Sequence, residues 1–507
     1  MENLNKTDQP TRRYLCRYAI PFIVIVIAIA ACDSSISVAP PPTTSPAASV
    51  SAELRPLLAQ RGITGDPSSD RELPSIDNPK AQLGMKVFFS KSMALNNKDT
   101  ACVSCHHPAL GGGDALSLPI GVEAENPEVL GVGRAHSITG VNHDGGPTVP
   151  RNAPTTFNIA LWDRVLFHDG RIESINPAAG HSGAKGGIRT PESKLGTADL
   201  NAGQNLVEAQ ARFPITSTEE MRGFNDIHGD DNNAVRGSLI GNNMAPDWDA
   251  EFDAVYGGSS GIAGTDPNNP YARVAEVLGA YQRSQVFVNN AWKDYVEGDE
   301  DAISESAKRG ALLFFNSYDA GGANCAQCHS GDFFTDEEFH AYAAPQIGRG
   351  KGDESGTGWG DNDFGRFRET GLKADMFTFR TPTLLNVAVT GPWTHAGAYT
   401  TLESVIRHKI NPAKAIAEYD FSQLNPSLQA SNMITNTQAA LDSGLDASIR
   451  VIELSVVQVA DIVAFLETLT DPCVVKRKCI ARWIPDAGIP NPDGLRLNAI
   501  DLTGNPL

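Results

Sequence analysis

The stretch Cys102-Val103-Ser104-Cys105-His106 determines how the rest of the chain is interpreted, because Cys325-Ala326-Gln327-Cys328-His329 repeats its pattern. C-x-x-C-H is the attachment signal for a c-type haem, in which the two thiols bond to the haem vinyl groups and the adjacent histidine becomes the proximal iron ligand. The chain has 8 Cys and 11 His in 507 residues, so chance would produce the pattern about 0.003 times in a chain of this composition. Two copies therefore predict two covalently bound haem c groups. The predicted thioether cysteines are Cys102, Cys105, Cys325 and Cys328, and the predicted proximal ligands are His106 and His329.

Two other kinds of site use the same cysteine spacing. A C-x-x-C pair can be half of a zinc site or a redox disulfide. A zinc site needs its remaining ligands close by, whereas no other cysteine lies between the two motifs. This favours haem attachment at both motifs. His107 follows the first motif directly, and we expect it to lie at the surface.

Composition sets limits on partners and domain number. A length of 507 residues suggests two to four domains. The formal net charge of -19 argues against nucleic acid and against anionic membrane surfaces as partners. The same charge would suit a basic redox partner, although a solvated acidic surface is the default interpretation. With 47 Gly and 32 Pro, much of the chain should be loop.

Residues 1–31 have the pattern of an export signal, with three arginines before an apolar run at 18–31. This run is shorter than the roughly 18 residues that span a bilayer. It ends in Ile29-Ala30-Ala31-Cys32, which resembles a bacterial lipoprotein box and implies cleavage before Cys32 and lipidation of its thiol; an uncleaved anchor is the alternative. Residues 32–52 are rich in Pro, Ser, Thr and Ala and predict a flexible tether. We expect a periplasmic protein held to a bacterial membrane only through this lipid or anchor.

The chain repeats itself around the two motifs. Three short stretches recur in the same order and at similar spacing, which indicates two copies of one unit. The fold class expected is mainly α, with two tandem c-type cytochrome domains, long irregular loops and little sheet. We place the domains at 53–265 and 266–480, followed by a tail at 481–507. The matching stretches are 84–89 and 310–315, 154–158 and 382–386, and 168–170 and 395–397.

The spacing of hydrophobic residues and the positions of helix-ending residues predict the main helices. We expect helices at 53–61, 80–89, 271–295 and 303–315, and one at 462–469 that Asp471-Pro472 ends. Cys473 and Cys479 follow, and in an exported protein they should form a small disulfide loop. The glycine-rich insertions at 176–205 and 348–365 should be surface loops or lids.

The two motifs, the two P-T-x-x-N stretches and the signal-bearing start together resemble the bacterial dihaem cytochrome c peroxidase superfamily. That superfamily includes the MauG-type enzymes, which oxidise residues of a partner protein. The resemblance covers roughly 79–471. It implies that the N-terminal haem is the peroxide site and that the C-terminal haem handles electrons.

In this superfamily a glutamine and a glutamate ten residues apart lie over the peroxide haem. The segment 208–221 resembles that part of the family, which implies distal roles for Gln210, Pro214 and Glu220. Peroxide must lose a proton from one oxygen and gain one on the other before its O–O bond breaks, and a carboxylate can carry that proton. The alternative is that Glu220 is one more exposed residue among 60 acidic ones.

Two departures from the family pattern concern the peroxide haem. The loop 110–122 resembles one in which typical peroxidases carry a ligating histidine, but the matching residue here is Val122. Valine has no lone pair, so the resting peroxide haem should be open; His136 or His143 could substitute by another loop path. In the run 167–171, His168 replaces the tryptophan that usually lies between the haems. Trp162 is a candidate relay, and a merely structural role for His168 is about as plausible.

The resemblance also bears on the second haem and on calcium. The distal ligand of the second haem is methionine or tyrosine in the family, and the matching position here is Lys409, with His408 beside it. For the distal position of the second haem, the sequence therefore leaves three alternatives: the lysine, the histidine or an open site. The family binds one Ca²⁺ between its domains, which implies oxygen ligands from Asn152, Thr390 and Pro392.

The leading functional hypothesis is a peroxidase that reduces hydrogen peroxide to water with electrons from a small cytochrome c or cupredoxin. The first alternative is a MauG-type enzyme that oxidises a residue of a partner protein. The second is a dihaem electron carrier without catalysis, against which Gln210 and Glu220 argue. A homodimer is compatible with the sequence.

Overall fold

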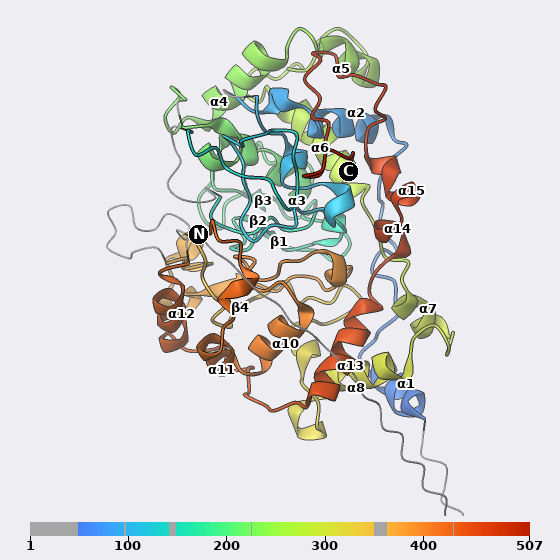
Figure 1. Cartoon of the computed structure of the whole chain (residues 1–507). Helices are drawn as coiled ribbons and strands as arrows, with labels where there is room; N and C mark the ends of the chain where they lie inside the picture. Colours follow the sequence, from blue (N-terminus) through green and yellow to red (C-terminus); the bar gives the residue numbers. More distant parts are fainter. Residues whose placement is uncertain (1–48, 96–97, 141–148, 225, 349–361, 429) are drawn as a thin grey trace, which may run out of the picture. The chain divides into compact units, whose positions relative to one another are not determined.

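The computed structural model describes residues 49–507 apart from 96–97, 141–148, 225, 349–361 and 429 (Figure 1). The predicted signal segment, Cys32, nearly all of the tether, His143 and most of the insertion at 348–365 lie outside the described residues. Within the described part, no helix is long and apolar enough to cross a membrane.

The structure is mainly helical with little sheet, as predicted. The strands form two small antiparallel sheets, one in the order β1-β2-β3 and one pairing β4 with β5. In the first sheet Leu166 pairs with Ile172 and Ser174 pairs with Ile188; in the second Phe339 pairs with Arg380. The helices are α1 (Val50–Gln60), α2 (Pro79–Phe88), α3 (Leu206–Ala211), α4 (Asn232–Ser238), α5 (Asp249–Tyr256), α6 (Ala272–Arg283), α7 (Ala291–Glu297), α8 (Glu305–Phe315), α9 (Phe367–Thr370), α10 (Leu402–Ile410), α11 (Pro412–Ala417), α12 (Met433–Asp442), α13 (Val456–Glu467), α14 (Pro472–Val475) and α15 (Arg477–Ile480). The strands are β1 (Val165–Leu166), β2 (Ile172–Ser174), β3 (Ile188–Arg189), β4 (Phe339–Ala341) and β5 (Thr378–Arg380).

The helices that precede the two motifs occupy equivalent places. Helix α2 packs on α6, and α8 packs on α13 (Figure 1). A Cβ on Gly84 of α2 would lie 1.9 Å from the carbonyl oxygen of Val277, and one on Gly310 of α8 would lie 1.9 Å from that of Asp461. The glycine repeated in the sequence is therefore the point at which each helix crosses its partner at close range.

Two hydrophobic cores follow this pairing. The first contains α2, α5 and α6, and the second contains α8 and α13. Leu54 of α1 belongs to the second core, whereas Trp483 and Leu497 of the C-terminal tail belong to the first. The two ends of the described chain thus each pack on the other half. The domain limits remain a prediction, and the packing adds that α6, placed by sequence in the second domain, belongs to the first core.

The segment predicted as one helix at 271–295 is two helices, α6 and α7, with a non-helical connector between them. The repeated asparagines explain the break. Asn158 donates its side-chain amide to the Phe287 carbonyl at 3.1 Å and accepts from the Phe287 N–H at 2.7 Å, while Asn386 donates to the same carbonyl at 2.9 Å. These bonds take the connector's backbone groups away from a continuous helix.

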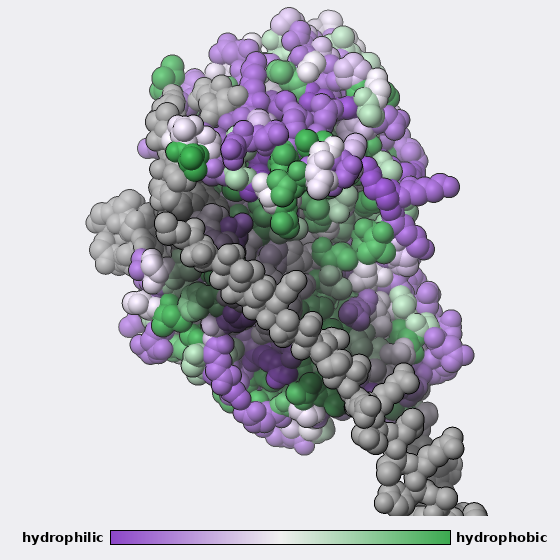
Figure 2. All heavy atoms as spheres, viewed as in Figure 1, coloured by the Kyte–Doolittle hydropathy of each residue, from purple (hydrophilic) through white to green (hydrophobic). Residues whose placement is uncertain are grey.

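The tail begins with the predicted disulfide. Cys473 and Cys479 are bonded, with their Cα atoms 5.1 Å apart. In the face shown in Figure 2, hydrophilic side chains cover most of the upper part and hydrophobic ones occur in separate small groups. Leu200 and Ile227 are exposed apolar residues, and single exposed apolar side chains are normal on a folded protein.

Candidate haem sites

Both motifs line one cavity of about 390 Å³, which lies within the size range of ligand sites. Each begins on a short 3₁₀ turn, η2 (Cys102–Ser104) and η9 (Cys325–Gln327). The His106 N–H bonds the Cys102 carbonyl at 3.1 Å, and the His329 N–H bonds the Cys325 carbonyl at 3.0 Å. These bonds hold each histidine on the same turn as its cysteines. The four cysteines are free thiols that face the cavity.

The ring orientation of each motif histidine suits iron ligation. The Nδ1 of His106 is 3.3 Å from the Gly112 carbonyl, and the Nδ1 of His329 is 3.1 Å from the carbonyls of both Phe334 and Pro382. A carbonyl only accepts, so Nδ1 carries the proton and Nε2 keeps its lone pair for a metal. Burial lowers the pKa of both rings to about 4, so both are neutral at pH 7. The residues of both motifs therefore fit a covalently held haem.

The three residues predicted over the peroxide haem share the cavity with the first motif. Gln210 on α3, Pro214 and Glu220 all line it. Glu220 lies in η6 (Thr218–Arg222), a π-helical turn whose N-cap Ser217 accepts from the Glu220 N–H at 3.3 Å. The charge of Glu220 contributes to a raised pKa at the Cys102 thiol, whose main cause is burial. Their placement is what the predicted roles require; the roles themselves remain predictions.

The loop that carries Val122 packs against this same turn. Val122 is buried, and its N–H bonds the Glu219 carbonyl at 3.2 Å. His136 is also buried, with Nε2 3.8 Å from a carboxylate oxygen of Glu123, and it does not line the cavity. Among the described histidines, those lining the cavity are His106, His168, His329, His340 and His395.

The expectation that His107 lies at the surface is wrong. Its side chain is fully buried, and its Nδ1 accepts from the Ala109 N–H at 3.1 Å. It thereby caps η3 (Pro108–Leu110), and its ring packs edge-on to Phe89. Burial lowers its pKa to about 3. The residue is a neutral capping group, a role that leaves no periodic signal in the sequence.

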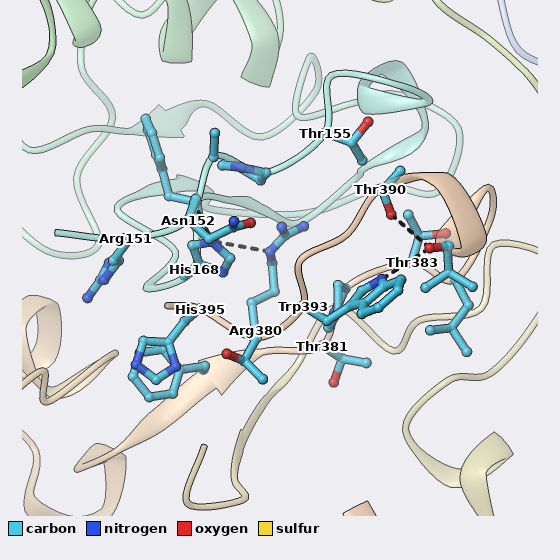
Figure 3. Close-up of a pocket in the computed structure, with 18 of the residues that line it drawn as sticks. Arg151, Asn152, Thr155, His168, Arg380, Thr381, Thr383, Thr390, Trp393 and His395 are labelled. Carbon is cyan, nitrogen blue, oxygen red and sulfur yellow. Dashed lines mark hydrogen bonds between the residues drawn. The ribbon is translucent and has the colours of Figure 1, made fainter. Parts of the chain in front are cut away.

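The region between the two motifs brings the repeated stretches together. Figure 3 shows Asn152 and His168 from the first half facing Arg380 and His395 from the second. His168 Nε2 lies 3.2 Å from the Asn152 carbonyl, and burial, together with nearby Arg151, lowers the His168 pKa to about 3. His168 is therefore a neutral, hydrogen-bonded residue, which suits the structural interpretation.

Trp162 also lines the cavity. The Arg380 guanidinium lies 3.5 Å from the centroid of its ring, and Phe333, which follows the second motif, packs on it edge-on at 5.1 Å. The indole thus contacts residues of the second half directly. Its proposed relay role remains a prediction.

Arg380 itself gave no signal in the sequence. It is buried, its Nη1 has no hydrogen-bond partner among the described residues, and burial lowers its pKa to about 10. His340 was missed as well: it lies between Asp336 at 2.8 Å and Asp446 at 2.7 Å, and the bond to Asp336 is the main reason that its pKa rises to about 11. Finding either would have required knowing which loops meet in space.

The two candidates for the second haem's distal ligand differ in position. Lys409 lines the cavity, whereas His408 does not. His408 Nδ1 is 2.9 Å from the Tyr399 hydroxyl, and its Nε2 is 2.9 Å from the Tyr342 carbonyl. Both ring nitrogens are engaged, so His408 has no lone pair to offer where it stands.

The predicted calcium ligands come from both halves of the chain. Asn152, Thr390 and Pro392 all line it, and Figure 3 shows Asn152 and Thr390 from the two halves. The Asn152 amide donates to the carbonyls of Leu116 at 2.8 Å and Ser117 at 3.1 Å. Calcium binding here remains a prediction.

Arg151, next to Asn152 in the chain, is the centre of a buried charge cluster. Arg151 bonds Asp363 through Nε at 2.6 Å and Nη2 at 2.7 Å, and bonds Asp169 through Nη1 at 2.6 Å. All three side chains are at most 6% exposed. The cluster ties the stretch after the first motif to a loop of the second half.

Comparisons with known proteins agree with this geometry. A family model described as di-haem cytochrome c peroxidase matches residues 78–301. The chain is 26% identical over 396 residues to the methylamine utilization protein MauG of Methylorubrum extorquens, covering 76% of this chain and 85% of that protein. It is 24% identical over 331 residues to the cytochrome c551 peroxidase of Pseudomonas aeruginosa, covering 65% of this chain and 71% of that protein.

Two solved structures share the fold. The diheme peroxidase BthA from Burkholderia thailandensis matches with a TM-score of 0.51 at 21% identity, covering 85% of this chain and 92% of that one. A MauG-like protein associated with microbial copper homeostasis matches with a TM-score of 0.50 at 21% identity, covering 82% of this chain and 97% of that one. Together with the two attachment motifs, these findings show that residues 78–301 match the di-haem cytochrome c peroxidase family and that the chain is similar over most of its length to cytochrome c peroxidases and MauG proteins, which are oxidoreductases.

Proposed function

We propose that the protein is a peroxidase that reduces hydrogen peroxide to water with electrons from a small redox protein, a cytochrome c or a cupredoxin. The observation that carries the proposal is that Gln210, Pro214 and Glu220 line the same cavity as the first attachment motif. When bound, haem supplies an iron atom that can bind an oxygen atom of peroxide and exchange electrons.

The chain's own residues supply the proton chemistry. Glu220 is held at the start of a short turn by the bond between its N–H and Ser217. Its carboxylate can accept a proton from one peroxide oxygen and deliver it to the other, and the Gln210 amide can donate a hydrogen bond to the oxygen that leaves. Pro214 adds an apolar surface to the same cavity. Two electrons from the donor and two protons then balance the conversion of one peroxide to two waters.

The test is the rate of peroxide consumption by the purified holoprotein with a reduced small cytochrome. Glu220→Gln should slow this rate by about 10²-fold or more without changing haem content. Glu219→Gln is the matched control, because Glu219 is the adjacent carboxylate and does not line the cavity. Equal rates in the two variants would contradict the assignment of Glu220.

A MauG-type oxidase is the second candidate. Val122 favours it, because its buried side chain has no lone pair and cannot cap the peroxide site. Such an enzyme would take its electrons from a residue of a partner protein instead of a soluble donor. An EPR spectrum of the oxidised protein, recorded before any reductant is added, tests the Val122 argument: a high-spin ferric component is expected, and two low-spin signals alone would contradict it.

We also propose that the protein is periplasmic and lipid-anchored through Cys32, and that Asn152, Thr390 and Pro392 bind one Ca²⁺. Mass spectrometry of the mature protein should find a diacylglyceryl group on Cys32, and Cys32→Ser should release the protein from membranes. Chelation should lower thermal stability if calcium is bound. Size-exclusion chromatography with light scattering would identify a homodimer.

A further inference from the structure

The glycine-rich insertion at 176–205, which the sequence predicts as a surface loop or a lid, is tied to the body of the protein. Near its start, the Asp163 carboxylate accepts from the N–H groups of Gly180 at 2.8 Å and Ser182 at 2.7 Å. Further along, strand β3 pairs with β2. A segment held by such bonds has little freedom to open as a lid.

Two acidic side chains of the insertion, Glu192 and Asp199, bind two arginines outside it. Arg212 donates from Nη1 to Asp199 at 2.6 Å and from Nη2 to Glu192 at 2.7 Å. Arg236 on α4 donates to both oxygens of Glu192, from Nη2 at 2.6 Å and from Nη1 at 3.0 Å. The exposed side-chain fractions are 1% for each arginine, 9% for Asp199 and 21% for Glu192, so water screens these charges only in part.

The two arginines need the carboxylates of the insertion. Both guanidinium groups lie beside the Phe213 ring, 5.7 Å and 5.5 Å from its centroid, and like charges enclosed in this way are unfavourable without counter-charges. Burial raises the pKa of Asp199, but hydrogen bonds from Thr190 and Arg212 outweigh burial and leave this pKa below its ordinary value. The carboxylate is therefore ionised at pH 7.

The network also reaches the backbone of the segment that carries Gln210 and Pro214. Arg236 donates to the carbonyl oxygen of Arg212 from Nε at 3.2 Å and from Nη2 at 3.1 Å. Helix α3, which ends just before Arg212, has 6 residues, too few to be stable through its own hydrogen bonds. Gln210 and Pro214 line the cavity, whereas Arg212 does not. The network thus holds this segment from outside the cavity.

We propose that Glu192 is a positioning residue for the peroxide site, because through Arg212 and Arg236 it holds residues 210–214 in place at the cavity. The insertion is then a fixed outer support of that site. Without the charge of Glu192, both arginines lose a counter-charge, and the Gln210 amide no longer keeps one position. The inference rests on the proposed function, since it needs Gln210 at the distal face of the first haem.

The first experiment is hydrogen–deuterium exchange of the wild-type holoprotein, read by mass spectrometry. The N–H groups of Asp199 and Ala202 bond the carbonyls of Ile188 at 2.8 Å and of Asp199 at 3.2 Å. Peptides that cover 188–202 should therefore exchange these amides at least about 10²-fold more slowly than an unfolded chain. Exchange at the unprotected rate would mean that the insertion opens freely, and it would overturn the proposal without any variant having to fold.

The second experiment records the C–O stretching band of the reduced holoprotein with carbon monoxide bound. A hydrogen-bond donor beside the bound gas lowers this frequency, so Gln210→Ala, which removes the amide, should raise the frequency of the first haem's band. Glu192→Gln should shift the same band toward the Gln210→Ala value at unchanged haem content. Lys194→Gln is the matched control, because Lys194 is an exposed charged residue of the same insertion, and it should keep the wild-type band.

The variants separate this inference from the proposed function. A shift in Gln210→Ala with none in Glu192→Gln would overturn positioning by Glu192 and leave the peroxidase assignment intact. An unchanged band in Gln210→Ala would overturn both. If Glu192→Gln does not accumulate as holoprotein, Arg236→Lys replaces it, since lysine keeps the charge but loses the planar fork that reaches the Arg212 carbonyl. The same shift is then expected, and its absence would overturn the proposal.

Discussion

Replacing Asp363 with asparagine should weaken the junction that Arg151 makes between the two halves of the chain. The two side chains form a bidentate pair, with Nε–Oδ2 at 2.6 Å and Nη2–Oδ1 at 2.7 Å. Only 6% of the Arg151 side chain and 2% of the Asp363 side chain are exposed. Asparagine keeps the shape of the residue but removes the charge, so the variant isolates the electrostatic part of the contact.

The pKa of Asp363 provides the magnitude. Burial alone would raise it, but the charge and hydrogen bonds of Arg151 hold the pKa at about 2, below the ordinary 3.8. At 1.36 kcal/mol per pKa unit, the ionised pair contributes roughly 2 kcal/mol to the free energy of unfolding at pH 7. Because the folded-state pKa is the lower one, this contribution is complete above pH 4 and falls as the pH approaches 2. About half of it should remain at pH 3.

The assay is urea unfolding followed by haem absorbance, since the thioether bonds keep haem attached as the chain unfolds. Asp363→Asn should lose at least roughly 2 kcal/mol at pH 7, and up to about 5 kcal/mol if Arg151 is left short of partners. The control is Asp319→Asn, which removes the ion pair with Arg450. The Arg450 and Asp319 side chains are 59% and 87% exposed, so this change should cost less than about 1 kcal/mol. Equal losses in the two variants, or a difference that does not shrink between pH 7 and pH 3, would refute the reasoning.

Two further predictions concern packing and the tail. Gly84→Ala and Gly310→Ala should each lower the thermal midpoint by several degrees or prevent accumulation of holoprotein, because the added Cβ meets a backbone carbonyl of the partner helix. The control is Gly237→Ala in α4, where nothing lies within 4 Å of the added Cβ. This control should leave stability unchanged or raise it by about 0.5–1 kcal/mol. The Cys473–Cys479 disulfide closes a loop with a sequence separation of 6, so reducing it should lower the free energy of unfolding by about 2 kcal/mol. The measurement is the thermal midpoint with and without dithiothreitol, at constant haem content. An unchanged midpoint would show that the tail is held by its packing alone.

Sequence patterns predicted those features that depend on local chemistry. The attachment motifs, the helices at α2 and α8 and the disulfide depend on short-range spacing, which one sequence contains. Gln210 and Glu220 were placed by resemblance, and the structure brings them to the cavity. These are positions where the residue type itself carries the information.

Features that depend on tertiary contacts were missed or mistaken. The break between α6 and α7 is made by Asn158 and Asn386, which reach Phe287 from distant stretches. His107 is buried because it caps a turn. His408 and Lys409 differ by one residue, or about 100° around a helix, so sequence alone could not tell which of them faces the cavity.

The repeat shows which positions are tied to haem binding in general and which are free to differ between the haems. Pro154 and Pro382 both provide carbonyl groups to the ring of their motif histidine. This arrangement sets the tautomer needed by any haem ligand, so both copies keep it.

His168 and His395 occupy matching places, yet His168 is hydrogen-bonded to a backbone carbonyl, whereas neither ring nitrogen of His395 has a partner among the described residues. Because the scaffold bonds are the same in both halves, differences at the cavity wall can change the chemistry of one haem without unfolding its domain. Glu220, which lines the cavity and interacts electrostatically with the cysteines of the first motif, is such a difference. If Glu220 moves a proton at the first site as proposed, the two otherwise similar sites would differ in their chemistry although their scaffolds match.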